Sequence, residues 1–237
     1  MLNAGLGTAG FELLRCGESD YVKPFLPFRK TLGGARKAGL SAGDYIDLKH
    51  QLPGATQATV GRMAELGVFS PKINNVCEIG PGSGRYLKKV LRLCAPCSYE
   101  IYETAREWSD WLVRTYPVRA HEADGRTLSQ TADGSVDLVH AHKVFVYLQV
   151  VVTCRYFSEM IRVARPGGRI VFDIFSEPCM ADAEMEKWAA SGSYFPNMIA
   201  RDFAIGFFAR RGCSLTSRFF APMKPGESEY LVFVKGA

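Results

Sequence analysis

The sequence predicts an α/β protein with a doubly wound, mostly parallel sheet of seven strands that closes in a C-terminal antiparallel hairpin. Short apolar segments alternate with amphipathic helical segments from residue 73 to residue 175, an order typical of parallel sheets covered by helices on both faces. A glycine-rich turn follows the first of these strands. Two strand-like segments near the C-terminus flank a Pro-Gly turn, which predicts the hairpin.

The individual elements are predicted from the spacing of apolar residues. Apolar residues three and four positions apart indicate helices, and short continuous apolar runs indicate buried strands. The turn "RPGG" is expected to lead into the fifth strand. The predicted strands are 73–79, 98–103, 117–123, 135–141, 169–175, 214–223 and 229–235, and the predicted helices are 85–94, 106–116, 154–164 and roughly 199–211.

The N-terminal part of the chain has a different texture. Residues 1–54 are rich in glycine, proline and aromatic residues, and we expect an irregular or helical cap ahead of one domain over 55–237. A helix at the start of that domain is expected to end near Gly67. The cap and an insertion at 177–198 are candidate lids over a bound acceptor, with ordinary packing as the alternative. Their aromatic residues are Tyr21, Phe25, Phe28 and Tyr45 in the cap and Trp188, Tyr194 and Phe195 in the insertion.

Composition narrows the class of protein. The chain has 237 residues and a net charge of +5, and its basic residues are scattered, so we expect no nucleic-acid partner. The most apolar run, 144–152, is too short to span a membrane, and no signal peptide is apparent. The seven cysteines lack a disulfide spacing, which favours a reduced, cytoplasmic protein. Cys94 and Cys97 form a CxxC that we interpret as two structural thiols rather than a zinc site.

The segment "VCEIGPGSGRYL" at 76–87 is the first candidate binding element. Gly80, Gly82 and Gly84 lie between a predicted strand and a predicted helix, where backbone N–H groups can meet a ligand closely. The dinucleotide fingerprint G-x-G-x-x-G fails because Arg85 occupies its third glycine position, and the Lys-Ser/Thr of a phosphate-binding P-loop is absent. Glu78 precedes the glycines, so a carboxylate accompanies the loop.

A second acid is expected near the end of the next strand, where it would accept ribose hydroxyl groups. Glu100 and Glu103 both lie at a suitable distance along the chain. Thr104 and Glu107 match a capping box, which predicts a helix from Thr104 and makes Glu103 the last residue of the strand. We therefore favour Glu103. Asp124, with Gly125, follows the third strand and is either a ligand of an adenine amino group or a residue that stabilises its own turn.

Five motifs in order resemble a known family. "CEIGPGSGRYL", Glu103, "ADGRTL", "DGSVDLVHA" and "ARPGGRIVFDI" are similar in order and spacing to class I, Rossmann-like S-adenosylmethionine-dependent methyltransferases, over roughly residues 55–237. The resemblance implies the fold of that family and S-adenosyl-L-methionine as cofactor, with its ribose on Glu103. It further implies that the methionine end and the adenine contact the remaining candidates, which are Glu78, Gly80, Pro81, Gly82, Gly84, Asp124, Gly125 and His140.

The catalytic candidates follow the fourth strand, in "LVHAHKVF". Methyl transfer to a hydroxyl group also requires that a proton leave, and histidine is suited to accept it. His142 is the first candidate base and His140 the second, because alternate residues of a strand point to one side. Lys143 is a candidate for orienting the acceptor. Asp173 and Glu177 would be the candidate ligands if the enzyme used a divalent metal, but we predict no metal.

The preferred function is O-methylation of a small-molecule or sugar hydroxyl group, in an enzyme whose partner is that acceptor. The Asn/Asp-Pro-Pro-Tyr/Phe element of adenine and amide methyltransferases is missing after the fourth strand. The alternatives are an N- or C-methyltransferase, a methyltransferase-like domain with a non-catalytic binding role, and a dinucleotide oxidoreductase. The sequence leaves a homodimer open.

Overall fold

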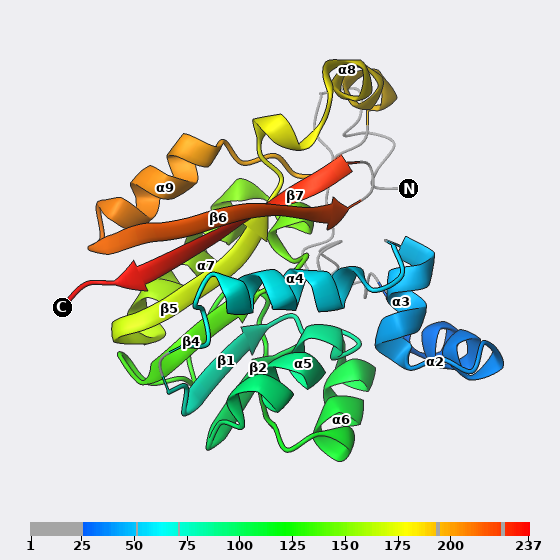
Figure 1. The fold of residues 1–237 in the computed structure, drawn as a ribbon, viewed down its shortest axis with the longest axis horizontal. Coiled ribbons are helices and arrows are strands. Elements are labelled where there is room, and N and C mark those ends of the chain that lie inside the picture. Colours follow the sequence, from blue (N-terminus) through cyan, green and yellow to red (C-terminus); the bar gives the residue numbers. More distant parts are fainter. Residues whose placement is uncertain (1–25, 51, 71, 193–194, 224–225) are drawn as a thin grey trace, which may run out of the picture.

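A computed structural model describes residues 26–50, 52–70, 72–192, 195–223 and 226–237. Its centre is one seven-stranded sheet in the order β3-β2-β1-β4-β5-β7-β6 (Figure 1). Strands β1 to β5 are parallel, and β7 runs antiparallel to both β5 and β6. The predicted fold class is thereby confirmed. The strands are β1 Asn75–Ile79, β2 Ser98–Tyr102, β3 Arg119–His121, β4 Val136–Ala141, β5 Ala164–Ile174, β6 Cys213–Met223 and β7 Gly226–Lys235.

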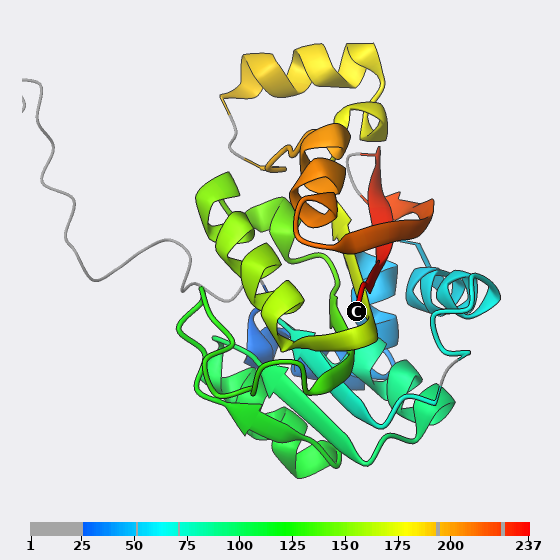
Figure 2. The same cartoon turned by 90° about the vertical axis from the view of Figure 1, so that its left-hand side faces the viewer.

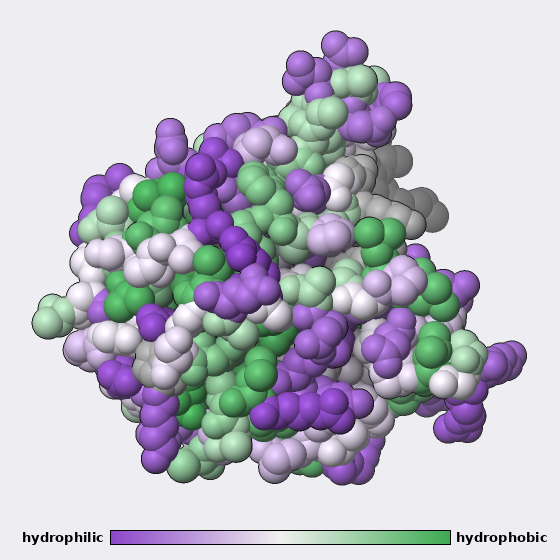
Figure 3. All heavy atoms as spheres, viewed as in Figure 1, coloured by the Kyte–Doolittle hydropathy of each residue, from purple (hydrophilic) through white to green (hydrophobic). Residues whose placement is uncertain are grey.

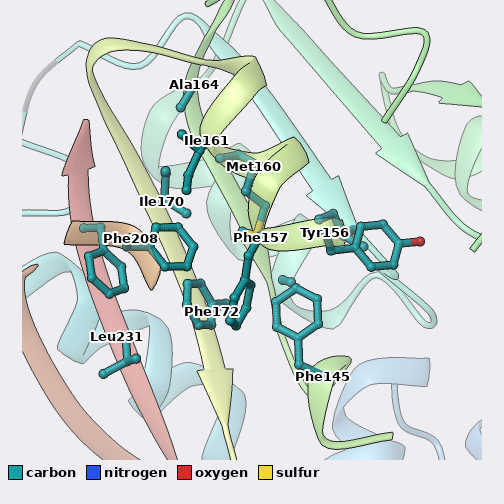
Figure 4. Close-up of a cluster of buried hydrophobic side chains, with 14 of the residues drawn as sticks. Phe145, Tyr156, Phe157, Met160, Ile161, Ala164, Ile170, Phe172, Phe208 and Leu231 are labelled. Atoms are coloured by element: carbon teal, nitrogen blue, oxygen red, sulfur yellow. The ribbon is translucent and has the colours of Figure 1, made fainter. Parts of the chain in front are cut away.

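Helices cover both faces of the sheet (Figures 1 and 2). On one face, apolar residues of α4, α5 and α6 share a buried cluster with β1, β2 and β7. On the other face, α7 and α9 enclose a cluster rich in phenylalanine (Figure 4). There the ring centroids of Phe157 and Phe172 are 4.7 Å apart, and those of Phe172 and Phe208 are 5.2 Å apart. The helices are α4 Ala55–Glu65, α5 Arg85–Cys94, α6 Arg106–Thr115, α7 Val150–Val163 and α9 Arg201–Ala209.

The described part of the N-terminal segment is helical. Helices α2 (Phe28–Lys37) and α3 (Ala42–His50) lie beside α5 and α6 (Figure 1). The ring of Phe28 meets that of Trp108 edge to face at 4.9 Å. Tyr21 and Phe25, which were expected in the cap, lie outside the described residues. The division at residue 54 and the role as a lid remain predictions.

The insertion after β5 contains a short 3-10 helix, η4 (Glu177–Cys179), and helix α8 (Asp182–Ser191). No residue of α8 is buried, and the helix projects from the sheet (Figure 2). Tyr194 lies outside the described residues. The position of α8 is compatible with a lid, which also remains a prediction.

Two predicted boundaries were wrong. The segment "RPGG" is part of β5 rather than a turn ahead of it, and the pairing of β5 with β4 is irregular between Val136 and Leu138. The helix predicted over 154–164 begins earlier, at Val150, so the apolar run 144–152 is divided between the 3-10 helix η3 (Phe145–Tyr147) and the start of α7, where Val150 and Val151 are exposed. Among the helices of the described residues, none combines the length and the apolar character that crossing a membrane requires.

Candidate active site

A pocket of about 390 Å³ opens where the strand order reverses between β1 and β4. Open α/β sheets bind ligands at this position, beyond the carboxyl ends of the strands. We call it the glycine-loop pocket, because the turn from β1 to α5 forms one wall. The loops after β2 and β4 and the helix α3 form the others. Its lining includes Gly80, Pro81, Gly82, Ser83, Tyr86, Glu103, Trp108, His142, Lys143, Tyr147 and Phe195.

The glycine loop has a left-handed backbone at all three glycines, with φ of 62° at Gly80, 52° at Gly82 and 67° at Gly84. At Gly80 and Gly84, neighbouring side chains of the protein leave no room for a Cβ atom. A Cβ atom on Gly80 would lie 2.8 Å from Val144 Cγ2, and one on Gly84 would lie 2.7 Å from Leu112 Cδ2. The loop is therefore shaped by internal packing as well as by any ligand that it meets.

Glu103 follows β2 directly and lines the pocket. Its Oε2 accepts the Gly82 N–H at 2.8 Å, and its Oε1 accepts the Ala105 N–H at 2.8 Å. Burial raises the pKa of this carboxyl, and the two N–H donors oppose the rise. The capping box was wrong: α6 begins at Arg106 and its N-cap, Ala105, has no side-chain cap. The carboxylate of Glu103 instead satisfies a backbone donor ahead of that helix.

Glu100, the other candidate acid, is held by contacts with other residues of the protein. Its Oε2 accepts the Thr131 hydroxyl at 2.6 Å and lies 3.0 Å from His121 Nε2. It does not line the glycine-loop pocket. The geometry therefore supports the choice of Glu103, and contact with a ribose remains a prediction.

Asp124 stabilises its own turn. Its Oδ1 accepts the N–H groups of Arg126 at 2.8 Å and Thr127 at 2.7 Å, and its Oδ2 accepts the Thr127 hydroxyl. Burial alone would raise the pKa of Asp124, but these hydrogen bonds outweigh it, so the pKa is lowered. A Cβ on Gly125 would lie 3.7 Å from Thr104 Cγ2, and Thr104 lines the pocket, so this turn is next to the pocket's rim. The adenine contact remains a prediction.

Glu78 lies behind the glycine loop. Its side chain is 1% exposed, it does not line the pocket, and its Oε2 accepts the Tyr99 hydroxyl at 2.6 Å. Burial raises the pKa of Glu78 to about 8, the Tyr99 hydrogen bond opposes this, and the charge of Glu103 adds to it. Glu78 therefore lies behind the lining of the pocket, and its contact with a cofactor remains a prediction.

The two candidate histidines are in contact. His140 Nδ1 and His142 Nε2 are 2.9 Å apart, as expected for alternate residues at the end of β4. His142 lines the pocket and stacks on the ring of Tyr86, with centroids 3.9 Å apart. His140 is fully buried and lies behind it. Burial lowers the pKa of His140 to about 3 and, with nearby positive charges, lowers that of His142 well below its usual value.

Lys143 is held by an acid of β5. Its N–H donates to Asp173 Oδ1 at 2.7 Å and its ammonium lies 3.1 Å from Asp173 Oδ2, with a further hydrogen bond to Ser228. Its φ of 57° is unusual for a residue other than glycine. The Glu177 carboxylate accepts the Arg201 N–H at 3.2 Å. Asp173 and Glu177 thus have protein partners, and no metal-binding cluster of three ligands occurs among the described residues.

Several site residues were not predicted. Tyr86, in the first turn of α5, lines the pocket, and so does Tyr147, whose ring stacks on that of Phe195, an aromatic residue of the predicted lid, with centroids 4.8 Å apart. Tyr86 lies two residues after Gly84, so its position in the sequence already suggested that it is close to the predicted ligand. Tyr99 and Tyr230 hydrogen-bond to Glu78 and His142. Nothing in the sequence singled them out, because both lie among apolar residues of predicted strands.

The residues present fit S-adenosyl-L-methionine. Ser83 is 3% exposed, lines the pocket, and its Oγ has no hydrogen-bond partner within the described part of the chain. Such a buried polar atom is normally satisfied, so a ligand group is an apt partner. The open backbone of Gly80 and Gly82 suits the methionine end, and the Glu103 carboxylate suits a ribose diol.

Outside this pocket, a hollow of about 290 Å³ lies along α5. Its lining includes Lys88, Lys89 and Arg92, and Figure 3 shows hydrophilic side chains gathered over this helix. The basic residues, scattered along the sequence as a whole, are thus locally concentrated on one helix.

Known proteins are similar to part of this chain in sequence and in fold. A family model described as a methyltransferase domain matches residues 77–172. The malonyl-[acyl-carrier protein] O-methyltransferase of Methylococcus capsulatus is 28% identical over 149 residues, which cover 59% of this chain and 52% of that protein. This chain therefore spans about half the length of that curated relative.

Two solved structures with bound S-adenosylhomocysteine are similar in fold. The magnesium protoporphyrin IX methyltransferase of Synechocystis PCC 6803 has a TM-score of 0.61 and 14% identity, covering 77% of this chain and 84% of that one. The N-methyltransferase NodS of Bradyrhizobium japonicum WM9 has a TM-score of 0.57 and 16% identity, covering 76% and 87%. At these identities the likeness establishes the fold.

Proposed function

We propose that this chain, which carries a class I S-adenosylmethionine-dependent methyltransferase domain, transfers a methyl group to a hydroxyl oxygen of a small molecule. One observation carries the proposal: the glycine loop, Glu103 and an aromatic wall face a single pocket at the β1–β4 reversal. When bound, the cofactor supplies a methyl group that its sulfonium has already activated. The protein's task is then to align the acceptor, exclude water and remove a proton.

The wall formed by Tyr147 and Phe195 supports an acceptor with a flat or apolar body. These rings stack almost in parallel, with an interplanar angle of 13°, and both line the pocket. Aromatic rings contribute to binding chiefly by burying apolar area and by stacking. A sugar face or an aromatic ring meets both conditions.

A carboxylate acceptor is the second candidate, because the relative from Methylococcus capsulatus is a malonyl-[acyl-carrier protein] O-methyltransferase. Two ion pairs at the pocket disfavour it. Arg85 pairs with Asp47 at 2.8 Å and Lys143 pairs with Asp173 at 3.1 Å. A carboxylate entering the pocket would therefore meet two cations that are already neutralised, and Lys49 is a further cation of the lining.

Two experiments test the proposal. In calorimetric titrations, S-adenosylhomocysteine should bind and NADH should not; heat from NADH alone would end the assignment. Next, methyl-labelled S-adenosylmethionine is offered with a phenol, a benzoate and an aniline that share one ring. We expect label in a base-stable ether of the phenol. Label that mild alkali releases as methanol would instead indicate a carboxylate acceptor, and label on the aniline would indicate an N-methyltransferase.

A further inference from the structure

A line of buried polar side chains runs from Glu78 to the glycine-loop pocket on the sheet face that α4, α5 and α6 cover. Each member lies within hydrogen-bonding distance of the next, and five strands or helices contribute. Buried polar groups that are connected in this way act as a unit. In order, the chain consists of Glu78, Tyr99, His140, His142, Tyr230 and Tyr86.

The links nearest Glu78 are short. The Tyr99 Oη lies 2.6 Å from Glu78 Oε2 and 3.0 Å from His140 Nε2, so one hydroxyl joins the carboxyl to the imidazole. The pairing of Glu78 with His140 across β1 and β4 places both on the same side of the sheet. The three side chains are at most 2% exposed.

The remaining links reach the pocket. His140 Nδ1 is 2.9 Å from His142 Nε2, and His142 Nδ1 is 3.2 Å from Tyr230 Oη. The last link, from Tyr230 Oη to Tyr86 Oη, is 3.4 Å. Tyr86 and His142 line the pocket, whereas Glu78 does not. The buried carboxyl is therefore connected to the pocket only through its neighbours.

The protons of the chain can be arranged in two ways, because each hydroxyl and each neutral imidazole donates one proton and accepts another. With Glu78 ionised, every donor points towards it: Tyr99 donates to the carboxylate and both histidines carry their proton on Nε2. With Glu78 protonated, every donor points towards the pocket and both histidines carry their proton on Nδ1. A shift of one proton per link converts one arrangement into the other.

We propose that this chain is a proton relay that carries the proton released by the acceptor hydroxyl at Tyr86 to Glu78. The inference rests on the proposed function. In the transfer, a C–S bond breaks and an O–C bond forms, and the acceptor's O–H bond breaks. The acceptor's proton goes to the Tyr86 oxygen while each link passes its own proton onward. The Tyr99 proton finally converts the Glu78 carboxylate to the acid, so charge and atoms balance.

The environment of the chain fits this role. Glu78 faces Tyr99 of β2 and His140 of β4, with Glu103 as the nearest further charge that acts on it. With its pKa raised to about 8, Glu78 is ionised, and so able to accept the relayed proton, chiefly above that pH. Burial keeps both histidines neutral, so they pass a proton by exchanging tautomers rather than by holding a positive charge.

The relay is tested on the protein alone by ¹⁵N NMR of the histidine ring nitrogens across pH 5 to 10. The chain has four histidines, so His140→Gln and His142→Gln suffice to assign the pair. We expect both histidines to change from Nδ1–H to Nε2–H in one transition centred near pH 8, where Glu78 ionises. In Glu78→Gln the transition should vanish.

Tyr99→Phe removes the link next to Glu78, and Tyr102→Phe is the matched control. Tyr102 is a buried tyrosine of the same strand whose hydroxyl lies 2.9 Å from Thr131 Oγ1, outside the relay. We expect Tyr99→Phe to abolish the joint transition and Tyr102→Phe to retain it. In turnover of the labelled phenol, Tyr99→Phe should lower kcat by about a hundredfold with little change in KM.

The outcomes separate the relay from the function on which it rests. Histidine tautomers that stay fixed with pH, or that change at different pH values, would refute the relay while ether formation from the phenol leaves the proposed function intact. A joint transition without any transfer of label would remove the catalytic role assigned to the chain.

Discussion

At the residue scale, the roles of the acids are decided by where each lies relative to a strand end. Glu103 follows the last residue of β2 and reaches the pocket, while Glu100 lies within the strand and bonds to Thr131. Glu78 lies within β1 and is enclosed. Three carboxylates thus have three environments, and only that of Glu103 suits direct contact with a cofactor.

Glu103→Gln should weaken binding of S-adenosylhomocysteine by about tenfold to a hundredfold, because an ionised hydrogen-bond acceptor is replaced by a neutral one. The dissociation constant is measured by calorimetry. Glu107→Gln is the control, since that side chain is 55% exposed and pairs only with Arg29 among the described residues. Equal affinity of Glu103→Gln and the wild type would exclude Glu103 as a ligand.

Gly84 is required for packing as well as for conformation. Gly84→Ala should lower the free energy of unfolding by about 2–4 kcal/mol, from a left-handed alanine and overpacking against Leu112. Gly134→Ala has a similar φ of 58° but nothing within 4 Å of the new Cβ, so about 1–2 kcal/mol is expected. Urea denaturation compares the two variants. Equal losses would contradict the packing contribution.

At the scale of elements, a buried carboxylate of α3 links the N-terminal helices to α4 and α5. Asp47 of α3 accepts the N–H and the hydroxyl of Thr56 at 2.9 and 2.6 Å, and it pairs with Arg85 at the start of α5 at 2.8 Å. The same helix α5 supplies Tyr86 to the pocket. The junction of α3, α4 and α5 therefore positions one wall of the site.

Asp47→Asn should lower the free energy of unfolding by about 3 kcal/mol, because the Arg85 guanidinium would remain buried without its partner. Urea denaturation measures the loss, and hydrogen exchange should show faster opening of α3. Asp44→Asn alters an exposed residue of the same helix and should change stability by less than about 0.5 kcal/mol. A similar effect of both substitutions would mean that the junction is not held by this ion pair.

At the scale of the whole molecule, the sheet buries ionisable groups whose pKa shifts change the stability of the fold with pH in opposite directions. The raised pKa of Glu78 means that the folded protein retains a proton that the unfolded chain loses above pH 4.5. The stability that protonated Glu78 contributes to the fold is therefore present at low pH and is lost as pH rises to about 8. The lowered pKa values of His140 and His142 contribute stability above pH 6.5 that is lost as pH falls.

These three groups together place maximal stability near pH 6.5. Glu78→Gln removes the ionisation that destabilises the wild type as pH rises. The free energy of unfolding of the variant, relative to that of the wild type, should therefore increase from pH 5 to pH 8. The expected slope is about 1.4 kcal/mol per pH unit. Melting temperatures of both proteins across this range provide the measurement. A constant difference would show that Glu78 has an ordinary pKa in the folded state.

The sequence by itself determined the order of strands and helices, the C-terminal hairpin and the position of the glycine loop. Each depends on residues close together in the chain: apolar spacing, turn residues and the glycines themselves. Glu103 could be selected by the same kind of reasoning, because the end of a strand is a local property. The capping box at Thr104, on which that choice depended, does not form, because the Ala105 N–H bonds to Glu103.

Only the tertiary structure decided how the polar residues are connected. Glu78 and His140, whose contact with a cofactor remains a prediction, are both buried, and Tyr99, Tyr230 and Tyr86 had no predicted role. Their contacts depend on the register of five strands and on which face of the sheet each side chain occupies. Those are relations between distant segments. Packing sets them, and no short stretch of sequence contains them.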